Sequence, residues 1–213
     1  MSERYDVIVS GYGLTGIAIA ALVSRRGHRV AVLERQPSMY GLPRMATIDS
    51  EGCRVVQAAS GNADYALRNT VANPRYALAN RDSEILMEAD WRGVDVSGFP
   101  VRSSMYQPDI EEAMDAQARA NGVDVFQGWE VAGLVQHEDR VVVTARERIV
   151  SASGGVTWGE PREFVASYVV GADGARSAIR TALGIEREGW PFRGAWLTID
   201  MESPRARLAV CGS

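Results

Sequence analysis

The sequence predicts an α/β protein in which a Rossmann-like dinucleotide-binding domain is joined to part of a β-sheet domain. Three observations predict this fold class. The first 34 residues have a strand–helix–strand pattern, a glycine-rich turn separates the first strand from the helix, and several strand candidates after residue 74 interrupt the alternation of strands and helices. With 213 residues, the chain has room for one large domain or for one domain with a partial second one.

The first 34 residues predict a βαβ unit. Residues 5–9 form a short apolar strand, and residues 14–26 are rich in Ala, Leu and Ile, as expected of a helix that packs on a sheet. Gly27 ends this helix, and residues 29–34 form a second strand that ends at Glu34. Since so short a connection through a helix joins parallel strands, the two strands should be parallel neighbours.

The rest of the chain predicts loops, a hairpin, a helix and further strands. Pro108 begins the helix, which has acidic residues in its first turn and ends before Asn121-Gly122. The turn residues Asn80-Arg81-Asp82-Ser83 predict the hairpin. The expected ranges are a weakly periodic helix over 48–59, a loop over 61–74, hairpin strands over 75–79 and 84–91, a helix over 108–120, strands over 123–126, 129–136, 140–146 and 168–171, a helix over 176–183, and strands over 195–201 and 207–211.

Composition and charge exclude several classes of function. The net charge of −4 and the isoelectric point near 5.3 argue against a nucleic-acid partner, because neutralising phosphates requires clustered Lys and Arg. No apolar run is long enough to span a membrane, and the polar start lacks the features of a secretory signal. Cys53, Cys211, His28 and His137 lack the spacing of a metal site, so we expect no metal and a cytoplasmic location.

The stretch GYGLTG matches the pattern G-x-G-x-x-G between the first strand and the helix. Gly11 permits the tight turn, Gly13 allows the backbone to approach a pyrophosphate, and Gly16 allows the helix to lie close to the strand. Leu14 and Thr15 begin the helix, where free N–H groups and the helix dipole favour a negatively charged ligand. The alternative is a tight turn without a ligand, since glycines are common at such turns.

Glu34 follows Gly16 by eighteen positions, at the end of the second strand. A carboxylate there can accept hydrogen bonds from a ribose diol, and its charge disfavours a 2′-phosphate. The pocket should therefore hold the adenosine of FAD or NAD rather than that of NADP.

A second glycine-containing turn, Gly171-Ala172-Asp173-Gly174, follows the strand expected over 168–171. In a doubly wound sheet, ligands bind beyond the carboxyl ends of the strands. Asp173 cannot attract phosphate by charge, so it orders the loop, binds a ribose hydroxyl or holds Arg176 or Arg180. The alternative is that Asp173 caps the helix expected over 176–183.

Four motifs together resemble the FAD-dependent group A aromatic hydroxylases, the p-hydroxybenzoate-hydroxylase-like monooxygenases. The most similar branch is that of the 3-(3-hydroxyphenyl)propionate hydroxylases. The motifs are GYGLTG with VAVLER at 30–35, LPR at 42–44 with IDSE at 48–51, YQPDIE at 106–111, and GADGARSAIRTALGI at 171–185. The resemblance covers essentially the whole chain. It departs from many relatives at Leu14, where they carry proline, and in the absence of their later Gly-Asp motif.

The resemblance implies a GR2-type FAD-binding domain over residues 1–73 and 106–185, and part of a substrate domain over 74–105 and 186–213. Arg44 would lie against the dinucleotide, and Gln107 would hydrogen-bond its ribityl or phosphate region. The alternatives from residue type alone are a solvated loop arginine and a helix-capping glutamine. The implied FAD-binding residues are Gly11, Gly13, Leu14, Thr15, Gly16, Glu34, Arg35, Arg44, Gln107, Asp173 and Gly174.

The resemblance also implies a reaction. FAD, reduced by NADH or NADPH, would react with O₂ and hydroxylate a small phenol-like aromatic substrate through a flavin C4a-hydroperoxide; no catalytic base is identified. The alternative is a truncated or split FAD-binding module that needs a partner chain, and a weaker one is an NAD-dependent oxidoreductase. We expect a second chain or a homo-oligomer to complete the sheet of the substrate domain.

Overall fold

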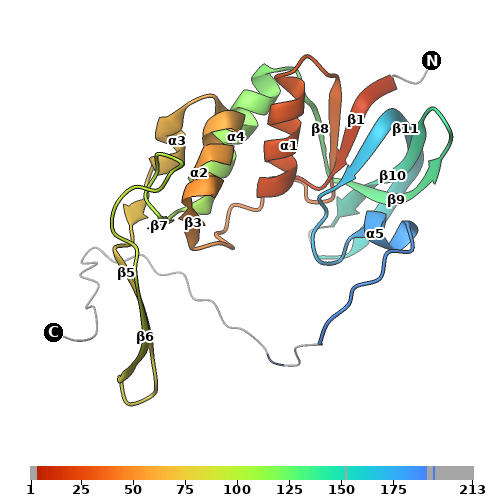
Figure 1. Ribbon diagram of the computed structural model, residues 1–213. Coiled ribbons are helices and arrows are strands. Elements are labelled where there is room, and N and C mark those ends of the chain that lie inside the picture. Colours follow the sequence, from red (N-terminus) through yellow and green to blue (C-terminus); the bar gives the residue numbers. More distant parts are fainter. Residues whose placement is uncertain (1–3, 152, 191–193, 195–213) are drawn as a thin grey trace.

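The computed structural model describes residues 4–151, 153–190 and 194. Its centre is a six-stranded sheet in the order β8-β2-β1-β11-β10-β9 (Figure 1). The first four strands of this order run parallel, and β10 is antiparallel to both of its neighbours. The strands are β1 (Arg4–Ser10), β2 (Val30–Glu34), β8 (Asp124–Gln127), β9 (Trp129–Gln136), β10 (Val141–Val150) and β11 (Val156–Gly171).

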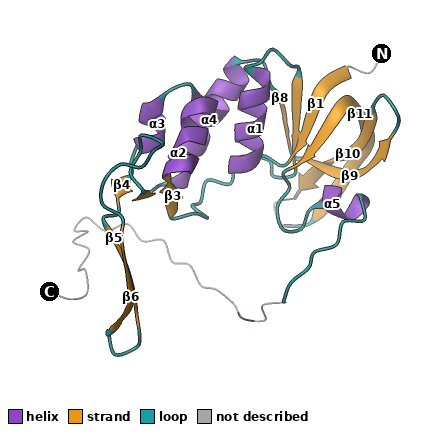
Figure 2. Cartoon of the chain, in the orientation of Figure 1, coloured by secondary structure: helices purple, strands orange, loops and turns teal. Residues whose placement is uncertain are grey.

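Long helices cover one face of this sheet, and a short helix lies against the other, as Figure 2 shows by colour. On one face, α1 (Leu14–Ser24) and α4 (Gln107–Ala120) pack together with α2 (Ser50–Ser60), and their apolar side chains form a core with Val9, Val30 and Val32. On the other face, Tyr5, Ile8 and Leu33 form a second core with side chains of β9, β10, β11 and α5 (Ala178–Ala182). Alternate residues of β1 and β2 therefore face two different cores, as expected of buried parallel strands.

The βαβ unit is confirmed, because β1 and β2 are parallel neighbours. Ser10 is paired with Leu33 on one side and with Gly171 on the other. The carboxyl ends of β1, β2 and β11 thus lie side by side at one edge of the sheet. The three loops that follow these strands meet at this edge.

The remaining elements form two small sheets and a short helix. A three-stranded sheet contains β3 (Thr47–Asp49), β7 (Arg102–Ser104) and β4 (Val71–Ala72). The hairpin of β5 (Arg75–Ala79) and β6 (Ile85–Asp90) is confirmed, and it projects away from the helices (Figure 1). None of the helices in the described part of the chain is long and apolar enough to cross a membrane.

Several predicted bounds were wrong. β11 begins at Val156 instead of 168, because its first half pairs with β10. This pairing is a tertiary contact, and a polar segment that contains a proline gives no local signal of a strand. The loop expected over 61–74 contains α3 (Ala63–Leu67), with Asn62 as its N-cap, and β4. β7 was not expected. The strands expected over 195–201 and 207–211 lie outside the described residues.

Candidate functional site

The glycine turn between β1 and α1 is built from close contacts between backbone atoms. Gly11 has φ +98°, and a Cβ atom there would lie 2.5 Å from the carbonyl oxygen of Ala172. A Cβ atom on Gly16 would lie 2.0 Å from the carbonyl oxygen of Gly11. Only glycine fits at either position, as the motif predicts. The turn therefore contacts both the start of α1 and the loop after β11.

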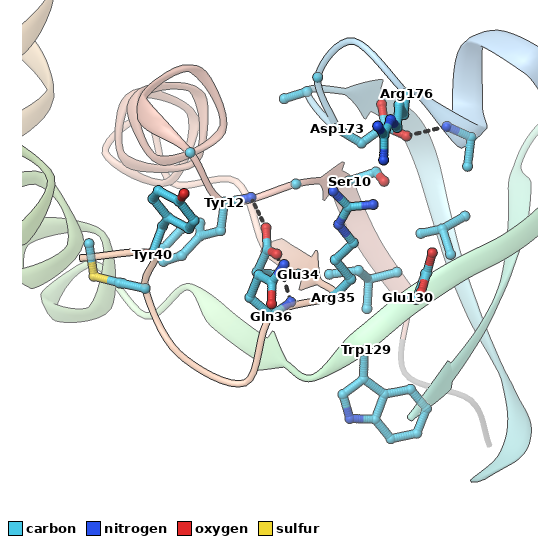
Figure 3. Close-up of a pocket in the computed structure, with 18 of the residues that line it drawn as sticks. Ser10, Tyr12, Glu34, Arg35, Gln36, Tyr40, Trp129, Glu130, Asp173 and Arg176 are labelled. Carbon is cyan, nitrogen blue, oxygen red and sulfur yellow. Dashed lines mark hydrogen bonds between the residues drawn. The ribbon is translucent and has the colours of Figure 1, made fainter. Parts of the chain in front are cut away.

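Glu34 links the end of β2 to this turn. The backbone N–H of Tyr12 donates to its Oε2 atom, and that of Gln36 donates to its Oε1 atom, both at 2.7 Å (Figure 3). The carboxylate is half-buried at the edge of a cavity. Because each carboxylate oxygen can accept more than one hydrogen bond, Glu34 keeps acceptor capacity for a ligand hydroxyl.

The cavity lies where the three loops meet at the carboxyl edge of the sheet, and its volume is about 250 Å³. It brings together seven of the eleven predicted site residues; the other four, Leu14, Thr15, Gly16 and Gln107, are not part of its lining. Figure 3 shows the polar side chains around it. The predicted residues that line it are Gly11, Gly13, Glu34, Arg35, Arg44, Asp173 and Gly174.

Three arginines place positive charge around the cavity, which three carboxylates also line. Arg44 stacks on the ring of Tyr40 at 4.4 Å, and its guanidinium lies 3.7 Å from the position a Cβ atom would take on Gly13. Arg35 and Arg176 also line the cavity. A guanidinium beside the N-terminus of α1 is suited to binding a phosphate, because its planar donors and the helix dipole both favour an anion.

Asp173 orders the loop after β11 and caps α5. Its Oδ2 atom accepts the backbone N–H of Ala178 at 2.7 Å and that of Ile179 at 3.2 Å, and the hydroxyl of Ser177 donates to Oδ1 at 2.5 Å. Its carboxylate also lines the cavity. Two of the expected roles, loop ordering and helix capping, therefore occur together.

We expect Asp173→Asn to lower the free energy of unfolding by about 1–2 kcal/mol, because an amide offers one acceptor oxygen where the aspartate offers two. Urea unfolding followed by circular dichroism measures this change. Asp139→Asn, on the exposed turn between β9 and β10, is the matched control and should stay within about 0.5 kcal/mol of the wild type. Equal stability of D173N and the wild type would contradict the capping role.

Gln107 lies at the start of α4 and is 3% exposed. Its Oε1 atom accepts the backbone N–H groups of Arg44, at 2.9 Å, and Met45, at 2.8 Å. Its Nε2 atom donates to Glu111 at 2.7 Å. In the described structure, both ends of this side chain are thus bound to the protein, and a contact with the dinucleotide stays a prediction.

A family model described as "FAD binding domain" matches residues 4–211 of the chain. The chain belongs to the FAD-binding domain family. It is 33% identical over 205 residues to a probable NADH-specific resorcinol 4-hydroxylase of Rhodococcus jostii, covering 95% of this chain and 37% of the relative. It is 32% identical to a 3-(3-hydroxy-phenyl)propionate/3-hydroxycinnamic acid hydroxylase of Burkholderia cenocepacia, covering 95% of this chain and 36% of the relative.

Solved structures agree with these relatives. The anhydrotetracycline hydroxylase from Streptomyces rimosus superposes with a TM-score of 0.67 at 26% identity, covering 89% of this chain and 36% of that chain. The resemblance to FAD-dependent aromatic hydroxylases is therefore confirmed, as is the α/β fold class. This FAD-binding domain spans little more than a third of the length of the curated relatives it matches.

Two residues of this FAD-binding domain that contact the glycine turn, Glu111 and Asp115, were not identified from the sequence. The backbone N–H of Leu14 donates to Glu111, whose pKa is raised by burial against the opposing effects of Gln107, Arg44 and this N–H. The hydroxyl of Tyr12 donates to Asp115 at 2.6 Å, and burial raises the pKa of Tyr12. Glu111 and Asp115 lie four residues apart on α4, so the spacing alone could have placed them on one face of the helix.

Proposed function

We propose that the cavity binds FAD, with the diphosphate at the N-terminus of α1 and the adenosine ribose against Glu34. The observation that carries this proposal is the glycine turn, where backbone contacts leave no room for a side chain on Gly11 or Gly16. Such a turn brings backbone N–H groups close to a pyrophosphate. Arg44, on the loop after β2, adds a cation beside Gly13.

The residues proposed to hold FAD differ in role. Arg35 and Arg44 supply positive charge, and Asp173 with Gly174 shapes the loop that closes the cavity beside Gly11. Gln107 acts at the same end of the site as Arg44, whose backbone it holds. The full proposed set is Gly11, Gly13, Leu14, Thr15, Gly16, Glu34, Arg35, Arg44, Gln107, Asp173 and Gly174.

For the whole protein we propose hydroxylation of a small phenol-like aromatic substrate. When bound, FAD accepts hydride from a reduced nicotinamide and reacts with O₂ to transfer one oxygen atom to an aromatic ring. The residues of this chain bind and orient the dinucleotide. The support is the set of hydroxylase relatives, one of which is named NADH-specific. The use of NADH or NADPH also fits the expected cytoplasmic location.

The test has two stages. Purified protein is first titrated with FAD, and quenching of flavin fluorescence should show saturable binding to one site per chain. Oxidation of NADH and of NADPH is then followed with and without resorcinol or 3-(3-hydroxyphenyl)propionate. Protein that folds but does not bind FAD contradicts the proposed site. Protein that binds FAD but never oxidises a nicotinamide supports the alternative, an FAD-binding module that acts only with a second chain.

We also propose that a second chain or a further copy completes the sheet of a substrate domain to which residues 74–105 and 186–213 contribute. The support is the β5–β6 hairpin, whose strands pair only with each other in the described part of the chain. It exposes the apolar side chains of Leu78, Ile85, Leu86 and Met87. Light scattering on the titrated protein measures the mass, and a monomer at all concentrations would contradict this proposal.

A further inference from the structure

Glu111 is the most deeply buried carboxylate among the described residues, with 2% of its surface exposed. It lies one turn into α4, on the face that packs against α1. A buried carboxylate is costly unless hydrogen bonds and a nearby cation compensate the loss of hydration. The groups that compensate the buried charge of Glu111 indicate which parts of the site this side chain holds in place.

Each of the groups that stabilise Glu111 belongs to the diphosphate end of the proposed site. The side-chain amide of Gln107 donates to Oε1 at 2.7 Å, and the backbone N–H of Leu14 donates from the start of α1. The guanidinium of Arg44 acts through its charge. Glu111 thus contacts the helix N-terminus and the glutamine that holds the arginine loop.

The carboxylate also fixes which way the amide of Gln107 points. A carboxylate only accepts hydrogen bonds, so the Nε2 atom of Gln107 must face Glu111. The Oε1 atom is then directed at the two backbone N–H groups of Arg44 and Met45. If the amide were reversed, its NH₂ group would face these two donors and no hydrogen bond would form.

We propose that Glu111 is a positioning residue for FAD: by orienting Gln107 it fixes the backbone of Arg44 and Met45, and so holds the Arg44 guanidinium beside Gly13 where the diphosphate binds. This inference rests on the proposed FAD function. It assigns a role to a carboxylate that does not line the cavity. In this proposal, the negative charge of Glu111 determines where the cation of the anion-binding site lies.

The test is a set of FAD titrations followed by flavin fluorescence, on Glu111→Gln, Arg44→Ala and the two combined. With glutamine at 111, one acceptor oxygen must serve two donors, so FAD should bind about tenfold more weakly. In the R44A background the same change should weaken binding by no more than about twofold, because the residue through which it acts is gone. Glu112→Gln, an exposed carboxylate next along α4, is the control and should leave affinity unchanged.

An exchanged pair separates positioning from simple loss of stability. In the variant Q107E/E111Q, a carboxylate faces the N–H groups of Arg44 and Met45, and an amide joins that carboxylate to Leu14. The hydrogen bonds that hold Arg44 and Met45 can be formed again, so the exchanged pair should bind FAD more tightly than E111Q does, although a carboxylate at position 107, itself in the proposed FAD-binding set, keeps the affinity below that of the wild type. Melting curves of all variants are measured without FAD, so that a stability change is seen separately from a change in affinity.

Three results would overturn the inference: E111Q binding FAD as well as the wild type, an equal loss in the wild-type and R44A backgrounds, or an exchanged pair as weak as E111Q. If E111Q is too unstable to titrate, Gln107→Met is used instead, because it removes the hydrogen bonds to the backbone of Arg44 and Met45. Its effect on FAD affinity is compared in the wild-type and R44A backgrounds, and an equal loss in both would overturn the inference. A wild-type protein that fails to bind FAD refutes the proposed function instead, before any variant is compared.

Discussion

Gly16→Ala is expected to abolish FAD binding and to lower the free energy of unfolding by about 3 kcal/mol or more. The added Cβ atom would lie 2.0 Å from the carbonyl oxygen of Gly11 and 3.0 Å from its carbonyl carbon. Both are backbone atoms, so no side-chain rotation relieves the overlap. The helix α1 must move away from β1, and the helix N-terminus then leaves the cavity. Urea unfolding and a flavin titration measure the two effects.

The matched control for this change is Gly133→Ala in β9. A Cβ atom on Gly133 meets no atom within 4 Å, and its backbone does not adopt a positive φ angle. This variant should fold and bind FAD as the wild type does. If G16A were as stable as G133A and retained FAD, the close approach of α1 to the glycine turn would not be required.

Glu34→Gln is expected to weaken FAD binding by about a hundredfold, because hydrogen bonds to a charged acceptor each contribute about 1.5–3 kcal/mol. In the variant, the amide offers one acceptor oxygen, while Tyr12 and Gln36 both present backbone N–H groups to the side chain. Either a backbone N–H group of the turn or a hydroxyl of the ribose therefore loses its hydrogen-bond acceptor. Isothermal titration calorimetry with FAD measures the loss, and Glu163→Gln, on an exposed part of β11, is the control.

The same variant, E34Q, tests whether the charge of Glu34 disfavours a 2′-phosphate, through the affinities of two adenosine nucleotides. The wild type should bind adenosine 5′-monophosphate more tightly than adenosine 2′,5′-bisphosphate, because a carboxylate repels the 2′-phosphate. In E34Q this preference should shrink. Equal discrimination in both proteins would mean that the adenosine ribose does not lie against Glu34.

The elements that could be predicted from sequence are those whose signal is local. The glycine motif with Glu34 predicted the βαβ unit correctly, and the turn residues at 80–83 predicted the β5–β6 hairpin correctly. Both predictions depend on residues close together in the chain. β11 was recognised only over its last four residues. Its first half contains Pro161 and several charged residues, and it becomes a strand by pairing with β10.

The candidate site was predictable to the same degree. The glycines and Glu34 could be named because the role expected of each depends only on its own backbone or carboxylate at a fixed spacing. Glu111 could not, because its role depends on Gln107 and on a loop more than sixty residues earlier. Asp173 was assigned a set of roles, and only the fold shows that its carboxylate reaches the N–H groups of α5.

The contact between Gly11 and Ala172 has a consequence for how the protein is made. β1 is flanked by β2, which follows it directly in the chain, and by β11, whose residue Val165 pairs with Arg4. During translation the first strand and its glycine turn emerge long before β11 does. One side of β1 therefore stays unpaired until β11 has been synthesised, and we expect the proposed FAD site to be complete only when residues near 172 have left the ribosome.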